Sequence, residues 1–243
     1  MKYLIIADIH SNLEAFESVL EDANNYGGFG HVWCLGDVVG YGPDPVACIG
    51  LLKQLDPLCV CGNHDLAAVG KIEIDDFNSD AAEASRWTAS QLTDDDKNFL
   101  FDLPEKIVKD DFTLTHGSPR MPIWEYIAHG YNATENFRYF ETRYCLVGHT
   151  HIPFVFEEEE GMANEGYLGD GDMLVLGDKR LIINPGGVGQ PRDRNPRASY
   201  AIYDSDEKKL VHYRISYDVE LTQEKMENAG LPAFLISRLA MGV

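Results

Sequence analysis

The sequence predicts an α/β fold of one domain, residues 1–243, in which polar motifs collect at one rim of the sheets. In residues 1–60, hydrophobic runs of strand length alternate with stretches of helical length, the pattern of a parallel sheet with crossover helices. From about residue 105 onward, short strand-like runs dominate. Five hydrophobic runs end directly in motifs rich in aspartate, asparagine and histidine. In α/β sheets such strand ends share the rim where ligands bind.

The N-terminal part is expected to form three strands joined by two helices. Each hydrophobic run has the length and the β-branched or aromatic enrichment of a buried strand. Ser11 and Asn12, followed by Glu14, offer an N-terminal cap to the first helix. The predicted strands lie at residues 3–7, 32–35 and 58–61, and the predicted helices lie at about 12–25 and 44–54.

Two helical segments are expected outside this alternation. Residues 66–104 lack strand-like runs and contain amphipathic patches near 79–91 and 94–101, so we expect a helical, cap-like insertion at one edge of the site. Residues 218–243 are expected to form a C-terminal helical appendage. The chain shows no internal repeat, linker or low-complexity tract.

The remaining part is expected to consist mainly of strands, interrupted by one helix near residues 132–140. A glycine-rich, acidic stretch, Gly161–Asp172, is expected to be a hairpin excursion. The predicted strands lie at about residues 105–108, 111–115, 144–147, 153–157, 173–176, 180–183, 198–204 and 208–214.

Charge and hydrophobicity exclude several classes of protein. The formal net charge is −20, and a strongly acidic surface repels polyanions. Broad binding to a nucleic-acid backbone needs clustered lysine and arginine and is not expected. No apolar stretch approaches the roughly 20 residues that cross a bilayer, and no leader pattern begins the chain, so we expect no membrane partner and a cytoplasmic location. The five cysteines are expected to be reduced, mostly core thiols.

The polar motifs contain side chains suited to divalent transition metals. They offer carboxylate and amide oxygens and neutral imidazole nitrogens but no thiolate, a set that suits Mn, Fe, Zn, Ni or Co. They are too many for one tetrahedral ion, and one shared carboxylate would complete two sites. Two metals about 3.5–4 Å apart are the recurrent device for in-line displacement at phosphorus, so phosphoester hydrolysis is the leading expectation. The candidate ligands are Asp8, His10, Asp37, Asn63, His116, His149 and His151.

Taken alone, most motifs also have an ordinary structural interpretation. Gly36-Asp37 is a turn signal, and a single histidine such as His116 is more often a satisfied structural residue. Gly62-Asn63 could begin an asparagine turn in which Gly62 has a positive φ. The occurrence of all the motifs in one chain, each after a hydrophobic run, favours the metal site.

Together, the motifs resemble those of the calcineurin-like metallophosphoesterase superfamily. Two further stretches, Gly36–Pro45 and Asn184–Asp193, resemble a group of small single-domain prokaryotic phosphodiesterases. The resemblance implies two packed mixed β-sheets flanked by helices, an αββα sandwich. The motifs that match are Asp8-x-His10, Gly36-Asp37, Gly62-Asn-His-Asp65, His116-Gly117 and Gly148-His-Thr-His151.

The resemblance also implies a role for each motif residue. Asp37 would bridge two metal ions, and His64 would bind no metal but act as general acid on the leaving oxygen. Asp65 is a candidate to orient the His64 ring. None of these positions departs from the family's pattern. The first metal would be held by Asp8, His10 and His151, and the second by Asn63, His116 and His149.

Basic residues are scarce, so those near the motifs are candidates for substrate binding. Arg120 follows His116-Gly-Ser-Pro, and Arg192 follows the glycine-rich stretch that begins at residue 184. A guanidinium fork suits nonbridging phosphoryl oxygens, although pairing with a surface carboxylate is the alternative for both. His129, in the loop after Arg120, is a further candidate. Asn63 is expected to hold a nonbridging oxygen in addition to its metal.

The sequence therefore predicts a dimetal hydrolase in which a metal-bridging hydroxide attacks phosphorus. A small or nucleotide-like phosphodiester is the expected substrate, because of the subgroup resemblance and because an acidic surface penalises a dianionic monoester more than a monoanionic diester. A phosphomonoesterase or phosphoprotein phosphatase would use the same metals and is the alternative. A non-enzymatic scaffold of the same fold would be expected to lack a ligand or His64, and this chain lacks neither.

Overall fold

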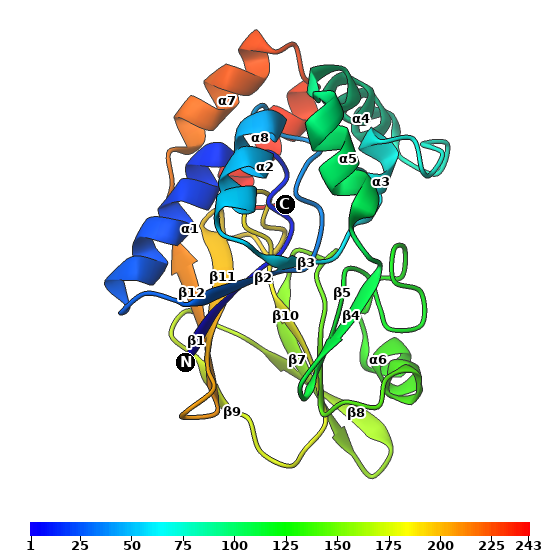
Figure 1. Cartoon of the computed structure of the whole chain (residues 1–243), viewed down its shortest axis with the longest axis vertical. Coiled ribbons are helices and arrows are strands. Elements are labelled where there is room, and N and C mark those ends of the chain that lie inside the picture. Colours follow the sequence, from blue (N-terminus) through cyan, green and yellow to red (C-terminus); the bar gives the residue numbers. More distant parts are fainter.

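The computed structural model describes all residues from 1 to 243 and arranges them in four layers (Figure 1). Two six-stranded sheets pack face to face in the middle. Helices α1 (Leu13–Asn25) and α2 (Pro45–Gln54) cover the outer face of the first sheet. Helix α6 (Gly130–Asn136) covers the outer face of the second. The expected αββα sandwich is confirmed.

The first sheet combines the N-terminal strands with the last two strands of the chain. Its three N-terminal strands are parallel, as their alternation with helices predicts, and the strands beyond them run antiparallel. The order across the sheet is β3 (Leu58–Cys59), β2 (His31–Cys34), β1 (Lys2–Ile6), β11 (Ala198–Asp204), β12 (Lys209–Ile215) and β9 (Met173–Val175).

The second sheet is built from the middle of the chain and is also mixed. Its three central strands, β5, β6 and β10, are parallel, and antiparallel hairpins form both edges. The order across the sheet is β4 (Lys106–Lys109), β5 (Phe112–Thr115), β6 (Tyr144–Leu146), β10 (Leu181–Pro185), β7 (Pro153–Glu159) and β8 (Met162–Tyr167).

Side-chain alternation along the strands divides the core into separate layers. In β1, Ile5 faces the second sheet, whereas Leu4 and Ile6 face the helices. In β2, Trp33 likewise faces the second sheet and Val32 faces the helices. Because central strands are buried on both faces, their sequences are continuously apolar, and this is why they are recognisable from the sequence.

The remaining helices lie at the upper end of the molecule, around the carboxyl ends of the first sheet's parallel strands (Figure 1). Asn78 and Thr93 cap two of them through side-chain oxygens. The helices of the expected insertion are therefore confirmed within a residue. The C-terminal segment is helical as expected, and it forms two helices because Gly230 and Pro232 interrupt it. The bounds are α3 (Asn63–Ala68), α4 (Ser79–Gln91), α5 (Asp94–Asp102), α7 (Val219–Asn228) and α8 (Ala233–Met241).

Three predicted details differ from the structure. Helix α3 was not expected, because it begins inside the Gly62-Asn-His-Asp65 motif and has one turn and a half. Residues 161–172 belong to a hairpin as expected, but they contain a regular strand that was not predicted, β8, which pairs with β7 at a sheet edge and so needs few apolar residues. The helix expected at 132–140 begins at Gly130 and ends in a 3₁₀ turn, Phe137–Tyr139.

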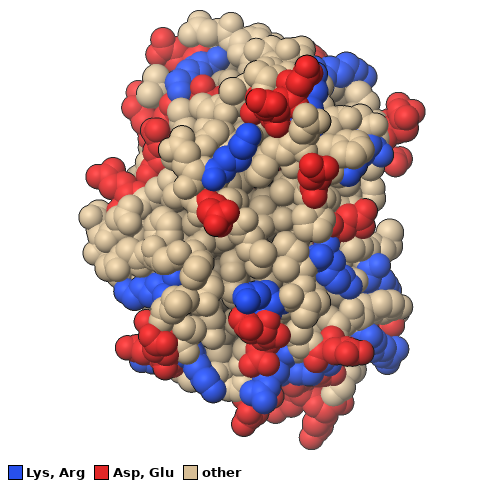
Figure 2. All heavy atoms as spheres, viewed as in Figure 1, with Lys and Arg blue, Asp and Glu red and all other residues tan.

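The charged residues, the cysteines and the helices are distributed as the composition predicts. Figure 2 shows acidic and basic side chains interspersed over the drawn face, with no basic patch gathered on it. All five cysteines are buried and unpaired, as expected. None of the helices combines the length and the apolar character needed to cross a membrane.

Candidate metal centre

The seven candidate ligands meet where the carboxyl ends of the parallel strands of both sheets come together. The first sheet contributes residues that follow β1, β2 and β3, and the second contributes residues that follow β5 and β6. All seven side chains are buried. The rim predicted from the strand ends is therefore present, and it is shared by the two sheets. Its residues are Asp8, His10, Asp37, Asn63, His116, His149 and His151.

The first cluster consists of Asp8, His10 and His151. Nδ1 of His10 lies 3.1 Å from the carbonyl oxygen of Val39, and Nδ1 of His151 lies 2.5 Å from that of Gln190. A carbonyl only accepts, so both Nδ1 atoms are protonated and both Nε2 atoms are acceptors. These Nε2 atoms nevertheless face each other at 3.1 Å, and Asp8 Oδ1 lies 3.4 Å from that of His151.

The second cluster surrounds Nε2 of His116. Its Nδ1 donates to the carbonyl oxygen of Leu35 at 2.9 Å, which leaves Nε2 as the inward atom. Within 3.2 Å of Nε2 lie Asn63 Oδ1, at 3.2 Å, and His149 Nδ1, at 3.0 Å. Asp37 Oδ2 also lies 3.2 Å away. Several electron-rich atoms therefore converge here as well.

Asp37 lies between the two clusters. Its Oδ1 accepts a hydrogen bond from the backbone nitrogen of His64 at 2.9 Å. Its Oδ2 has no hydrogen-bond donor although it is buried. This oxygen is 3.6 Å from Nε2 of His10 in the first cluster and 3.2 Å from Nε2 of His116 in the second.

Protonation alone does not satisfy these groups. Burial lowers the pKa of His10, His149 and His151 well below the ordinary value, so these imidazoles remain neutral. Burial also lowers the pKa of His116, but the Asp37 carboxylate outweighs it and raises that pKa to about 9. A proton on Nε2 of His116 can be shared with only one of the neighbouring atoms at a time. A metal cation would instead attract all of these atoms together. The residues present therefore fit divalent cations.

The backbone that carries these ligands is strained. Asp8, His10, Asp37, His149 and His151 all have φ between 48° and 65°, the left-handed region that β-carbons disfavour. Such conformations cost of order 1–3 kcal/mol each and persist where the surrounding structure imposes them, commonly at functional sites. The sequence motifs do not reveal this feature, because aspartate and histidine also occur in this region in ordinary turns.

Glycine is needed at Gly62 for close approach and not for a positive φ. Its φ is −108°, so the asparagine turn with positive φ at this residue is not formed. A β-carbon on Gly62 would lie 2.0 Å from Asp37 Oδ1. Gly189 is similar, because its β-carbon would lie 1.8 Å from the carbonyl oxygen of Ile9. Both glycines let loops pack against the ligand-bearing segments.

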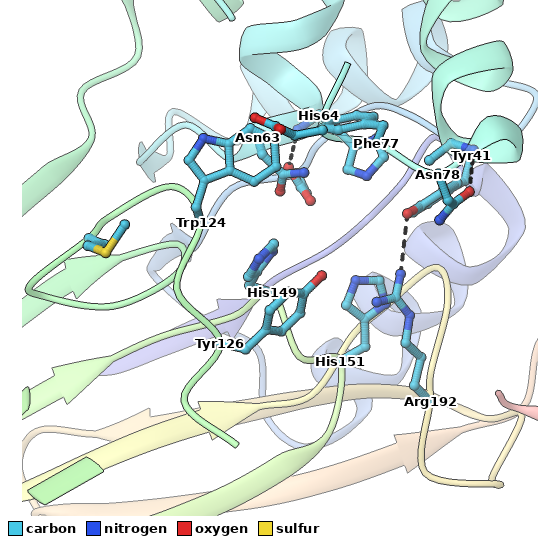
Figure 3. A pocket seen from close by; sticks show the side chains of 14 residues that line it. Tyr41, Asn63, His64, Phe77, Asn78, Trp124, Tyr126, His149, His151 and Arg192 are labelled. Atoms are coloured by element: carbon cyan, nitrogen blue, oxygen red, sulfur yellow. Dashed lines mark hydrogen bonds between the residues drawn. The ribbon is translucent and has the colours of Figure 1, made fainter. Parts of the chain in front are cut away.

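A cavity of about 400 Å³ opens above the clusters. Figure 3 shows Trp124 and Tyr126 on one side of it, Tyr41 and Arg192 on the other, and His64, His149 and His151 between them. Arg192 is the basic side chain of the lining. The lining residues are Asp37, Tyr41, Asn63, His64, Asp76, Phe77, Asn78, Ala81, Met121, Trp124, Tyr126, His149, His151 and Arg192.

His64 lies at the cavity, but Asp65 does not orient its ring. The Asp65 carboxylate accepts from the backbone nitrogens of Val39 at 3.1 Å and Gly62 at 2.9 Å. Nδ1 of His64 has no hydrogen-bond partner. Its ring packs between the rings of Tyr41 and Phe77, with centroid distances of 4.3 Å and 4.8 Å. The expected role of Asp65 is therefore corrected: it positions the backbone around the motif.

Two further candidates for substrate binding lie outside the cavity lining, which does not favour that role for them. Arg120 forms an ion pair with Glu125, donates to it from Nε at 3.2 Å, and does not line the cavity. His129 is exposed at the start of α6 and is also absent from the lining. The loop after His116 does pass over the rim, but it presents Trp124 and Tyr126 there.

Arg192 lines the cavity, and its role as a phosphate-binding residue stays a prediction. No carboxylate lies within ion-pair distance of it, although the chain is strongly acidic. Its Nη2 donates to Gln190 Oε1 at 2.9 Å and lies 3.5 Å from the Tyr41 hydroxyl. The sequence did not indicate that Tyr41, Phe77, Trp124 and Tyr126 line the cavity, because aromatic residues most often belong to a core.

Comparisons with known proteins agree with this geometry. The sequence profile of the calcineurin-like phosphoesterase superfamily domain matches residues 1–208. The uncharacterized protein MJ0912 of Methanocaldococcus jannaschii is 40% identical, with coverage of 98% of this chain and 97% of the relative. A metallophosphoesterase crystal structure from Sphaerobacter thermophilus is 46% identical with a TM-score of 0.92, covering 100% and 99% of the two chains.

The hypothetical protein PH1004 from Pyrococcus horikoshii shares the fold at 19% identity, with a TM-score of 0.82 and coverage of 100% of this chain and 98% of that one. With its strand-end motifs, its buried clusters of imidazole and carboxylate groups and these relatives, the chain belongs to the calcineurin-like phosphoesterase superfamily and is a metal-dependent phosphoester hydrolase.

Proposed function

We propose that this protein hydrolyses small phosphodiesters at two divalent transition-metal ions that share Asp37. The observation that carries the proposal is the buried Oδ2 of Asp37, which has no hydrogen-bond partner and lies between the two clusters. One ion would be held by Asp8, His10 and His151, and the other by Asn63, His116 and His149. Oxygen and imidazole ligands without thiolate suit Mn, Fe, Zn, Ni or Co.

When bound, the ions would supply an activated water and neutralise charge on the phosphoryl group. The chain's own residues would do the rest. Arg192, free of carboxylates, would bind a nonbridging phosphoryl oxygen with its guanidinium. Asn63, which lines the cavity, would position the same group.

His64 would act on the leaving oxygen. Burial lowers its pKa to about 4, so the ring is neutral near pH 7 in the free protein. An anionic phosphoryl group placed beside it would favour the charged form of the ring, which then donates a proton or a hydrogen bond to the leaving alkoxide. Its partnerless Nδ1 and its place in the cavity lining support this role.

A diester fits the charge of the cavity better than a monoester. Apart from the metal ions, Arg192 is the one arginine or lysine of a lining that also holds Asp37 and Asp76, so a second negative charge on the substrate has no further basic side chain to meet. The test is kcat/KM for bis-p-nitrophenyl phosphate against p-nitrophenyl phosphate, with Mn, Ni, Co, Fe and Mg supplied in turn. We expect the diester to be preferred under the most active metal. A clear advantage for the monoester would instead support a phosphomonoesterase or phosphoprotein phosphatase.

A further inference from the structure

Three aromatic side chains form one side of the cavity mouth, and the metal clusters do not require them. We call Phe77, Trp124 and Tyr126 the aromatic wall. Phe77 comes from the connection between α3 and α4, and the other two come from the connection between β5 and α6. Segments far apart in the sequence therefore bring aromatic rings to the same opening.

The wall packs against hydrophobic clusters on its far side and is open to the cavity. Phe77 packs on its far side against the cluster of α4, α7 and α8, and Trp124 packs against Cys61, Leu66 and Ile123. The two rings meet edge to face, with centroids 5.5 Å apart and an interplanar angle of 80°. Neither is fully buried. Tyr126 is 48% exposed and stacks on His149 at 3.8 Å.

The wall adjoins the reacting groups. The Phe77 ring lies 4.8 Å from the His64 ring, and the stacked Tyr126 covers one face of the His149 ring. Arg192 lies across the cavity from Trp124, and the Tyr126 hydroxyl points toward it (Figure 3). A phosphoryl group held between the clusters and Arg192 would therefore direct one ester substituent over the wall. Aromatic side chains bind bases by stacking, and every base presents a flat π-face.

Two polar residues beside Phe77 could hydrogen-bond to the polar edge of a nucleobase. Asp76 and Asn78 both line the cavity. Asn78 Oδ1 accepts from the backbone nitrogen of Ala81 at 2.9 Å, so its amide nitrogen is the group left to donate. The Asp76 carboxylate forms no ion pair and is a ready acceptor for an exocyclic amine. An aliphatic substituent would use neither the ring faces nor these two groups.

We infer that the phosphoester substrate is a nucleotide whose base stacks on the aromatic wall. This inference rests on the proposed function, because it assumes that the phosphoryl group lies over the metal ligands. It narrows the expected small or nucleotide-like substrate to a nucleotide, and it assigns recognition of the base to Phe77 and Trp124, residues outside the motifs that bear the ligands.

The test is equilibrium binding of AMP and of ribose 5-phosphate to the metal-loaded protein, measured by calorimetry. The two ligands share the phosphate and the ribose and differ only in the base. We expect AMP to bind on the order of tenfold more tightly to the wild type, as one stacked base provides. In Phe77→Ala and Trp124→Ala this ratio should fall toward one, while the affinity for ribose 5-phosphate, which reports an intact phosphate site, stays unchanged.

Tyr131→Ala is the matched control, because Tyr131 is an aromatic residue of α6 that is 82% exposed and outside the lining. It should keep the wild-type ratio. Equal affinity of the wild type for the two ligands, or a ratio retained by the double variant of Phe77 and Trp124, would overturn the inference. Failure of the proposed function is a separate result, namely absence of diester hydrolysis with every metal supplied, because these binding measurements need no turnover.

Discussion

The floor and the mouth of the cavity are built in opposite ways. The floor consists of polar side chains directly after strand ends, and its seven candidate ligands are at most 4% exposed. The mouth consists of aromatic side chains on two long connections, and Tyr126 and Met121 are about half exposed. The difference teaches that the sheets position the groups that carry out the chemistry, whereas the loops present the surface that selects the substrate.

The mouth is nevertheless ordered by a polar network of its own. Glu125, between Trp124 and Tyr126, accepts from Ser118 Oγ at 2.5 Å and from Asn136 Nδ2 at 3.1 Å. Arg120 completes this arrangement through its ion pair with the same carboxylate. Arg120, which was expected to bind substrate, thus stabilises the loop that carries Trp124 and Tyr126.

The largest effect should come from the floor. Asp37→Ala should abolish hydrolysis and release metal from both positions, because one carboxylate serves both clusters. The loss of metal affinity should exceed the roughly 10–100-fold that is typical of changing a residue behind a ligand. Elemental analysis of the purified variant measures it. His10→Ala should weaken mainly one position, and Asp76→Asn, which changes an acid of the mouth, should leave both occupied. Two tightly held metals in Asp37→Ala would contradict the shared role.

The second effect concerns His64, where the floor meets the mouth. His64→Ala should retain its metals but lose on the order of 10²–10⁴-fold in kcat, the contribution typical of a general acid. Because good leaving groups need little protonation, the loss should be smaller for p-nitrophenyl esters than for alkyl esters. Metal content and kcat for both ester types are the measurements. An equal loss for both esters would argue against the acid role.

The smallest effect should distinguish the two arginines. Arg192→Ala should raise KM, and the inhibition constant of inorganic phosphate, on the order of tenfold with little change in kcat, because a charged hydrogen bond to phosphate is lost. Arg120→Ala should leave the phosphate inhibition constant unchanged, because its guanidinium is paired with Glu125 outside the cavity. Inhibition by phosphate measures this independently of any contact with the aromatic wall. Similar shifts in the two variants would show that the cavity lining does not separate their roles.

Much of the architecture could be predicted from local patterns. Apolar runs flanked by turns identified the central strands, and Asn12 caps α1 as expected, since its side-chain oxygen accepts from Ala15 at 3.1 Å. The hydrophobic patterns did not predict elements that lack a regular apolar period. Strand β8 has few apolar residues because it lies at a sheet edge, and α3 is too short to show a period.

The sequence by itself determined which residues could form the floor, because each strand ends at a recognisable point and places the next polar residues at the rim. Only the tertiary structure decided how they meet: that two sheets share the rim, that Asp37 lies between two clusters, and that Arg192 faces the cavity while Arg120 faces Glu125. The physical reason is that strand periodicity is local, whereas loop direction depends on contacts between residues distant in the chain. Phe77 and Trp124 are 47 positions apart, and only packing brings their rings within 5.5 Å.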